Sequence, residues 1–278
     1  MLLKKDSIEG LKSLEDESIN CIVTSPPYNK KGLQGKAPTK TKKQLQEIEK
    51  NSDPEKLKRY KYHEKGNTIW NKFEIDYDSF GDDMPEEEYQ AWMIELLNEC
   101  HRVIKKDGSI FFNHKPRRHK NRVYLPTDFI SKSNVELFQL IIWDRRSSPN
   151  IRKENLVPCT EHIYWFCKDK PKTFRDKLDK NFIGEVWKIT ADKQKDHPAP
   201  FPTQLVKNCI LLSTEKDDLV LDPFMGSGTT AMVSKSLGRK WLGYEISETY
   251  IDIAESRIND VKTNDVKTID NLGLITEN

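Results

Sequence analysis

One segment of the chain combines an apolar run, a carboxylate and two closely spaced glycines. It reads Asp222-Pro223-Phe224-Met225-Gly226-Ser227-Gly228-Thr229, directly after the apolar residues 219–221. Glycine at 226 and 228 lets the backbone approach a ligand and adopt conformations that a Cβ forbids. Glu245 ends the next apolar run, where an acidic residue can accept both hydroxyls of a ribose. The pattern indicates a nucleoside-bearing cofactor; a structural turn with a surface glutamate beyond it is the alternative.

The glycine pattern differs from two common phosphate-binding motifs. It is not the three-glycine dinucleotide fingerprint, and it has no lysine of the kind found in a phosphate loop. A pyrophosphate is therefore not clearly required.

A second segment, Ser25-Pro26-Pro27-Tyr28, ends the apolar run 19–25. Two successive prolines fix φ and remove two backbone donors, so their carbonyls are rigid and free to accept. Such a carbonyl and the Ser25 hydroxyl can together bind a planar amino group. Tyr28 offers an aromatic face on which a base can stack. The alternative is a strand that ends in a proline turn, with Tyr28 packed on the core.

Basic residues gather in three places. Lys and Arg outnumber Asp and Glu by 12 to five over residues 29–65, and further clusters lie at 115–122 and 145–153. Adjacent arginines near predicted strand ends are the strongest candidates for contacts to phosphate: Arg117, Arg118, Arg145 and Arg146. Ordinary solvated charge is the alternative for each of them.

The elements that must position these residues follow from hydrophobic periodicity and punctuation by Gly and Pro. Strands are predicted at 19–25, 109–113, 135–143, 162–167, 219–224 and 240–246. A helix begins at Pro85, with Gly108 just past its end, and further helices cover 203–213, 229–237 and the stretch from the cap Ser247 to Asn259. Alternating strands and helices predict an α/β fold with a mostly parallel sheet covered on both faces.

The composition of the chain limits the classes of protein to which it can belong. The 278 residues carry 46 basic and 44 acidic side chains, so a net charge of +2 gives no global affinity for polyanions. No apolar run is long enough for a membrane span, and the start has no signal-peptide core. Five cysteines without paired spacing argue against a disulfide framework or a zinc site, so we expect no metal and a cytoplasmic location.

Taken together, the Ser25–Tyr28 and Asp222–Thr229 segments resemble the paired motifs of amino-methylating DNA methyltransferases. The proline segment comes first and the glycine segment nearly 200 residues later, an order similar to the circularly permuted β group. The resemblance covers roughly residues 6–258. It implies a Rossmann-like domain over 1–262, with a basic insertion at 29–80, a short target-recognition region at 169–196 and a disordered tail at 263–278.

The resemblance also implies a cofactor, S-adenosyl-L-methionine (SAM), and a set of cofactor contacts. Asp6 occupies the place of an acidic residue near the adenine ring, although this chain has Lys5-Asp6 where many members have Gly-Asp. The segment His197-Pro198-Ala199-Pro200-Phe201-Pro202 resembles the one that lines the methionine end. The remaining contacts would come from the glycine turn and Glu245.

The implied reaction is methyl transfer to the amino nitrogen of a base flipped out of duplex DNA. Hydrogen bonds to Ser25 and the Pro26 carbonyl would free the nitrogen lone pair, with Tyr28 stacking on the base. Members with Ser at position 25 mostly methylate cytosine N4 and those with Asp mostly adenine N6, so cytosine N4 is favoured and adenine N6 is the alternative. Double-stranded DNA is the expected partner, together with a cognate restriction endonuclease and a second copy of the chain.

Three other classes of protein fit the sequence less well. A nucleotide-dependent oxidoreductase would leave the Ser25–Tyr28 segment unexplained. A protein-glutamine methyltransferase also binds a planar amide, but it has Asn first and the reverse motif order. A DNA-binding module without catalysis conflicts with two intact motifs.

Overall fold

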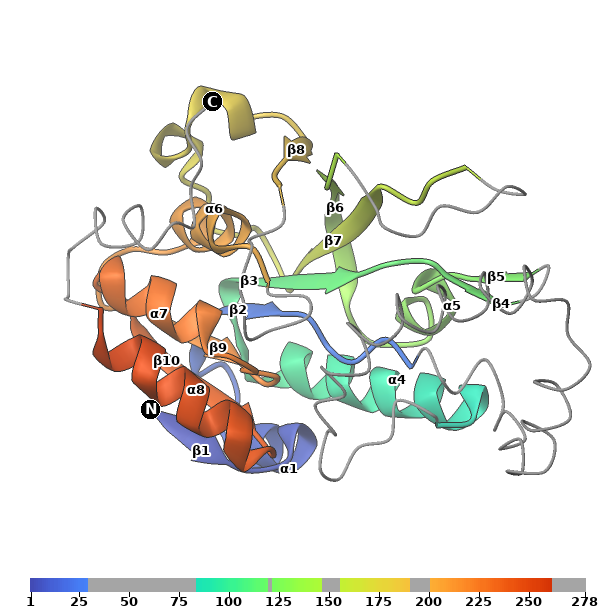
Figure 1. Ribbon diagram of the computed structural model, residues 1–278, viewed down its shortest axis with the longest axis horizontal. Helices are drawn as coiled ribbons and strands as arrows, with labels where there is room; N and C mark the ends of the chain where they lie inside the picture. Colours follow the sequence, from blue (N-terminus) through green and yellow to red (C-terminus); the bar gives the residue numbers. More distant parts are fainter. Residues whose placement is uncertain (30–83, 120–121, 147–155, 191–200, 262–278) are drawn as a thin grey trace, which may run out of the picture.

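Eight strands form one sheet in the order β1-β10-β9-β2-β3-β7-β6-β8 (Figure 1). The computed structural model describes residues 1–29, 84–119, 122–146, 156–190 and 201–261. The strands of this sheet are β1 (Leu2–Lys4), β2 (Ile19–Thr24), β3 (Ile104–His114), β6 (Glu136–Asp144), β7 (Thr160–Cys167), β8 (Val186–Lys188), β9 (Leu219–Asp222) and β10 (Lys240–Glu245). A separate hairpin joins β4 (Arg117–His119) to β5 (Arg122–Tyr124).

Strand direction divides the sheet into two parts. β1, β10, β9, β2 and β3 are parallel to one another, whereas β7 runs antiparallel to both β3 and β6. The prediction of an α/β fold with a mostly parallel sheet is therefore confirmed. The expectation that both faces are covered is wrong for the start of β6, where Leu137 and Phe138 are each 50% exposed.

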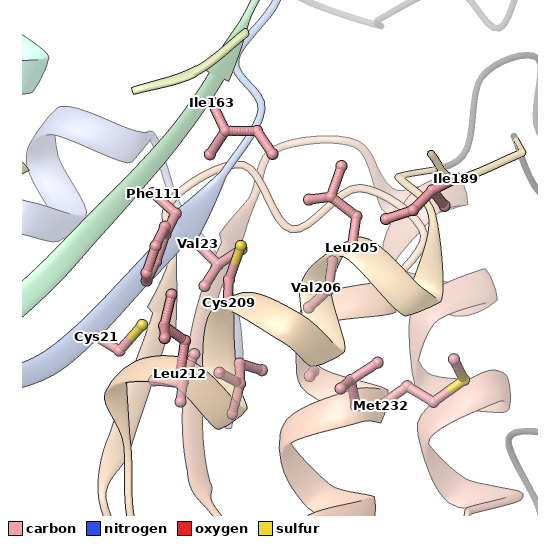
Figure 2. Packing of buried hydrophobic residues seen from close by; sticks show 14 of the residues in the cluster. Cys21, Val23, Phe111, Ile163, Ile189, Leu205, Val206, Cys209, Leu212 and Met232 are labelled. Carbon is pink, nitrogen blue, oxygen red and sulfur yellow. The ribbon is translucent and has the colours of Figure 1, made fainter. Parts of the chain in front are cut away.

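Helices cover the sheet on two sides, and alternating strand residues feed two separate cores. α1 (Ser7–Lys12), α4 (Glu86–Val103) and α5 (Thr127–Ile130) pack on one face, against Ile22, Ile110 and Phe112. α6 (Thr203–Ser213), α7 (Thr229–Ser236) and α8 (Glu248–Asn259) lie on the other (Figure 1). Figure 2 shows α6 placing Leu205, Val206, Cys209 and Leu212 close to Cys21, Val23 and Phe111 of the sheet.

Gly108 is not the end of a helix, as the sequence suggested. α4 ends at Val103, and β3 begins at Ile104 without an intervening loop. Gly108 lies within β3, where a Cβ would come within 2.8 Å of the Asn20 carbonyl oxygen of the neighbouring chain segment. Close backbone approach, not a helix cap, is the reason for this glycine.

The backbone returns to its point of departure on either side of residues 30–83. The side-chain amide of Asn29 donates to the carbonyl oxygen of Met84 at 2.8 Å, and Asn29 is only 2% exposed. The predicted basic insertion lies almost wholly outside the described residues. The predicted tail at 263–278 lies outside them as well.

The region at 169–190 packs onto the main sheet. It contains two 3-10 turns, Arg175–Lys177 and Lys180–Phe182, followed by β8, which pairs with β6. Trp187 is 1% exposed and joins the core beneath α6. Any recognition role for the described part of the predicted region, 169–190, would therefore come from residues that are built into the fold. Among the described residues, no helix is both long enough and apolar enough to cross a membrane.

Candidate active site

Most of the predicted site residues meet at one edge of the sheet. The carboxyl ends of the parallel strands β2, β3, β9 and β10 lie there, and the opposite direction of β7 brings its first residues to the same edge. Ligands of open α/β sheets bind at this edge.

A short hydrogen bond joins the two motifs. Thr24, the residue before Ser25, donates from its hydroxyl to Asp222 Oδ1 at 2.8 Å, and both residues are buried. Asp222 Oδ1 also accepts from the backbone N–H of Phe224 at 3.0 Å, and Oδ2 accepts from the Thr230 hydroxyl at 2.7 Å. Although 198 residues separate them in sequence, the two segments are therefore side by side.

Burial governs the chemistry of Asp222. It raises the pKa of this carboxyl from 3.8 to about 6, although the three donors from Thr230, Phe224 and Thr24 oppose the rise. Each carboxylate oxygen already has an internal partner. Asp222 therefore holds the turn in shape, and a direct contact with a cofactor stays a prediction.

The glycine turn has a left-handed backbone at two positions. Gly226 has φ +51° and Gly228 has φ +82°, conformations that side chains disfavour. A Cβ at Gly228 would lie 2.9 Å from the Ala254 Cβ of α8, so helix packing excludes a side chain there. At Gly226, by contrast, a Cβ would meet only the Phe224 carbonyl oxygen, at 3.9 Å, among the described residues, so these leave this face of the turn open to a ligand.

Arg257 of α8 stabilises the turn by hydrogen bonds. Its guanidinium donates to both the carbonyl oxygen and the hydroxyl of Ser227, the latter at 2.7 Å. It also reaches the Thr229 hydroxyl at 3.4 Å. Ser227 and Thr229 are both buried, so these two predicted contacts shape the turn.

Two carboxylates lie at the ends of adjacent strands beside the turn. Glu245 Oε2 accepts from the Gly226 N–H at 2.8 Å, while Oε1 accepts from the N–H groups of Ile246 and Ser247. The Lys5 N–H donates to the Glu245 carbonyl oxygen at 3.1 Å, which places Asp6 next to this strand end. Asp6 caps α1 with one oxygen, accepting from Ile8 N–H at 2.9 Å. Glu245 Oε2 accepts one internal hydrogen bond and has a second lone pair, so it and the open face at Gly226 fit a nucleoside with ribose hydroxyls.

The other predicted cofactor contacts, two within the turn and two before α6, are packed into the fold. Pro223 is buried, and the Phe224 ring meets Trp92 of α4 edge-on at 5.6 Å between centroids. Phe201 packs against the core, and Pro202 precedes the first residue of α6. Residues 197–200 lie outside the described residues.

The Ser25–Tyr28 segment is held by hydrogen bonds at both ends. The Ser25 and Tyr28 hydroxyls lie 3.0 Å apart, and the Tyr89 hydroxyl of α4 donates to the Pro27 carbonyl oxygen at 2.8 Å. The Tyr28 ring contacts the imidazole of His114, with centroids 4.6 Å apart. Tyr28 is thus fixed through both its ring and its hydroxyl.

Glu161 of β7 lies at the centre of this network. It is 5% exposed, and its Oε2 accepts from the Tyr28 hydroxyl at 2.9 Å and from Asn113 Nδ2 at 3.1 Å. Its Oε1 accepts from Lys115 at 3.3 Å and from Arg145 at 2.9 Å. Burial alone would raise the pKa of Glu161, but the nearby cations and hydrogen bonds hold it below its ordinary value.

His114 stays neutral at the same edge. Burial lowers its pKa to about 3. Its Nδ1 lies 2.9 Å from the Lys115 carbonyl oxygen, and its Nε2 lies 2.8 Å from the Tyr89 oxygen.

The four predicted phosphate-binding arginines differ in burial and in hydrogen-bond partners. Arg117 is 5% exposed and makes two hydrogen bonds to Glu86, at 2.8 and 2.7 Å, so its burial argues against the expected contact to DNA, which stays a prediction. A buried arginine with a carboxylate partner has no free face for a phosphate. Arg145 binds Glu161 within the site, whereas Arg118 and Arg146 are exposed.

Sequence reasoning missed Asn113, His114 and Glu161 as site residues. Each is a polar side chain at the end of an apolar strand, in Phe-Phe-Asn-His and Thr-Glu-His. Buried polar residues at a strand end are the signal that could have found them. Their convergence depends on the antiparallel pairing of β3 with β7, which no local pattern shows.

The fold and the site define an α/β protein in which the glycine turn and Glu245 lie at the same edge of the sheet as the rigid Ser25–Tyr28 segment. The N6_N4_Mtase family, described as DNA methylase, matches residues 19–256. The chain therefore belongs to this family of DNA methylases. The resemblance seen in the motifs is confirmed at that level.

Individual relatives are similar over most of this chain. The type II methyltransferase M.BglII of Bacillus subtilis is 28% identical over 90% of this chain and 66% of its own length. The DNA adenine methyltransferase YhdJ of Escherichia coli is 26% identical over 93% and 82%. Thus this chain spans about two thirds of M.BglII.

Solved structures share the fold. The cytosine-N4-specific PvuII DNA methyltransferase superposes with a TM-score of 0.68 at 22% identity, covering 98% of this chain and 92% of that one. The Thermus thermophilus protein TTHA0409, in complex with S-adenosyl-L-methionine, has a TM-score of 0.60 at 20% identity, covering 93% and 92%.

Proposed function

We propose that this protein transfers a methyl group from SAM to the exocyclic N4 of cytosine in duplex DNA. The observation that carries the proposal is the Thr24–Asp222 hydrogen bond of 2.8 Å. It holds the segment that would bind an amino group beside the turn that would bind the cofactor. Proximity of the two reactants supplies much of the acceleration in such a transfer.

The glycine turn, Glu245 and Asp6 would hold the cofactor. The open face at Gly226 leaves room for it, and Glu245 and Asp6 lie at adjacent strand ends, within reach of a ribose and a base. Bound SAM would supply an electrophilic methyl group on its sulfonium. A likeness to a solved complex with SAM supports this choice.

The Ser25–Tyr28 segment would bind the acceptor. The Ser25 hydroxyl and the Pro26 carbonyl would accept the two amino protons, which favours a pyramidal nitrogen with an available lone pair. Because this nitrogen lies inside a base pair in duplex DNA, the base must flip out, and Tyr28 would stack on it. Arg118 and Arg146, both exposed, are the remaining candidates for phosphate contacts.

Ser25 supports cytosine, and adenine N6 is the second candidate. The likeness to a cytosine-N4-specific enzyme supports the first, whereas the similarity to YhdJ, named as an adenine methyltransferase, supports the second. The motif order further supports a permuted domain of the β group. In that group we expect a cytoplasmic enzyme, a cognate restriction endonuclease and a dimer.

One experiment tests the proposal. Purified protein is incubated with SAM and unmethylated duplex DNA of mixed sequence, and the digested nucleosides are quantified by mass spectrometry. We expect N4-methylcytosine, and a Ser25→Ala variant should reduce it while SAM still binds. N6-methyladenine would overturn the choice of base, and a lack of any methylated nucleoside would overturn the function.

A further inference from the structure

The buried carboxylate of Glu161 reaches the proposed acceptor site through a single hydroxyl. Its side chain is 7% exposed, and its Oε2 lies 2.9 Å from the Tyr28 oxygen, which in turn lies 3.0 Å from Ser25 Oγ. Asn113 Nδ2 contacts all three groups, at 3.1, 2.8 and 3.4 Å. Glu161, Tyr28 and Ser25 therefore form one hydrogen-bonded chain.

Counting hydrogens fixes the direction of this chain. An ionised carboxylate can only accept, so the single hydroxyl hydrogen of Tyr28 goes to Glu161. Burial and the Glu161 charge raise the pKa of Tyr28 well above its ordinary value, so this hydrogen is present at neutral pH. In the Ser25–Tyr28 hydrogen bond the Tyr28 oxygen must then accept, so the Ser25 hydrogen is directed to Tyr28.

We propose that Glu161 is a positioning residue that acts through Tyr28 to make the Ser25 oxygen a hydrogen-bond acceptor toward the target amino group. This inference rests on the proposed function. A serine hydroxyl can otherwise donate or accept, and a donor facing an amino group would repel it. With its hydrogen engaged, Ser25 offers only lone pairs, as an aspartate would at the same position.

The surrounding charges suit this role and argue against proton uptake by Glu161. Lys115 and Arg145 both contact Oε1, at 3.3 and 2.9 Å, on the side away from Tyr28. They keep Glu161 ionised, and for the same reason they make it a weak base. A carboxylate that contacts two cations can orient the Tyr28 hydrogen, but it has little tendency to accept a proton.

The test is a double-mutant cycle between Glu161→Gln and Tyr28→Phe. Glutamine is isosteric but its amide can donate to Tyr28, which lets the chain reverse. In the wild-type background we expect Glu161→Gln to lower kcat for DNA methylation by about 10- to 100-fold, with the Kd for SAM unchanged. In the Tyr28→Phe background, where the connecting hydroxyl is absent, the same change should lower kcat by less than about threefold.

Controls separate the possible failures. Glu215→Gln makes the same chemical change at an exposed position before β9 and should leave kcat unchanged. Equal fold losses in both backgrounds would overturn the positioning role, as would an unchanged kcat for Glu161→Gln. If the Tyr28→Phe variant is too slow for the cycle, the effect of Glu161→Gln is measured instead by single-turnover rates in a Ser25→Asp background. The loss should be small there too, because an aspartate accepts a hydrogen bond without help from Tyr28. A wild-type protein that methylates no base would instead overturn the proposed function itself.

Discussion

The Thr230→Val substitution tests whether Asp222 depends on its internal donors. Thr230 is 1% exposed, and its hydroxyl donates to Asp222 Oδ2 at 2.7 Å. Valine has nearly the same shape but no donor, so a buried carboxylate oxygen loses its partner. Since hydrogen bonds to charged groups contribute about 1.5–3 kcal/mol, the free energy of unfolding should fall by about 2–3 kcal/mol near pH 8.

The stability lost on Thr230→Val should be larger above the folded pKa of Asp222 than below it. The folded pKa of Asp222 is raised from 3.8 to about 6, so this carboxyl favours folding most below pH 3.8, and that contribution is lost as pH rises through about 6. Above that value Asp222 is ionised and needs the Thr230 donor most. At about pH 5 the group is largely protonated, and the cost of Thr230→Val should shrink to about 1 kcal/mol, as for a neutral hydrogen bond.

Urea denaturation followed by tryptophan fluorescence measures both values. Thr230→Ser keeps the hydroxyl and is the matched control, with an expected loss below about 1 kcal/mol from one methyl group. The reasoning is refuted if Thr230→Val costs the same at both pH values, or if Thr230→Ser costs as much as Thr230→Val.

Two further predictions concern the glycine turn and the arginines. Gly228→Ala should lower the free energy of unfolding by about 2–4 kcal/mol, because the left-handed backbone and the contact with α8 both oppose a Cβ. Gly184→Ala, whose Cβ would have no atom of the described part of the chain within 4 Å, should change it by less than about 0.5 kcal/mol in the same urea titration. Arg117→Leu should destabilise the fold by about 3–5 kcal/mol, because Glu86 then lacks its partner. Arg118→Ala should leave stability unchanged and weaken DNA binding in a salt-dependent manner, and the opposite pattern would contradict these assignments.

Sequence patterns predicted the elements that carry strong local signals. The helix at 203–213 matches α6, and Ser247 caps α8 by accepting from the Tyr250 N–H. β1, the β4–β5 hairpin and β8 were missed, since each strand has three residues and too few positions to show a period.

The candidate site was predictable in part for a physical reason. Ser25 and Asp222 each follow an apolar strand, so parallel strands bring both to one edge without further information. Glu161 comes from a strand of opposite direction, its partner Asn113 lies in β3, and its partner Arg145 directly follows β6. Arg117 has the same local sequence signals as an exposed arginine, because its partner Glu86 lies 31 residues away.

The contact between Asn29 and Met84 closes the framework with one hydrogen bond at the point where the described chain is interrupted. Where the two ends of a segment meet, each doubling of its length costs only about 0.6 kcal/mol in closure entropy. This point of attachment directly follows Ser25–Tyr28. The framework around the acceptor segment can therefore accept insertions of different length at this point without a change in the described contacts.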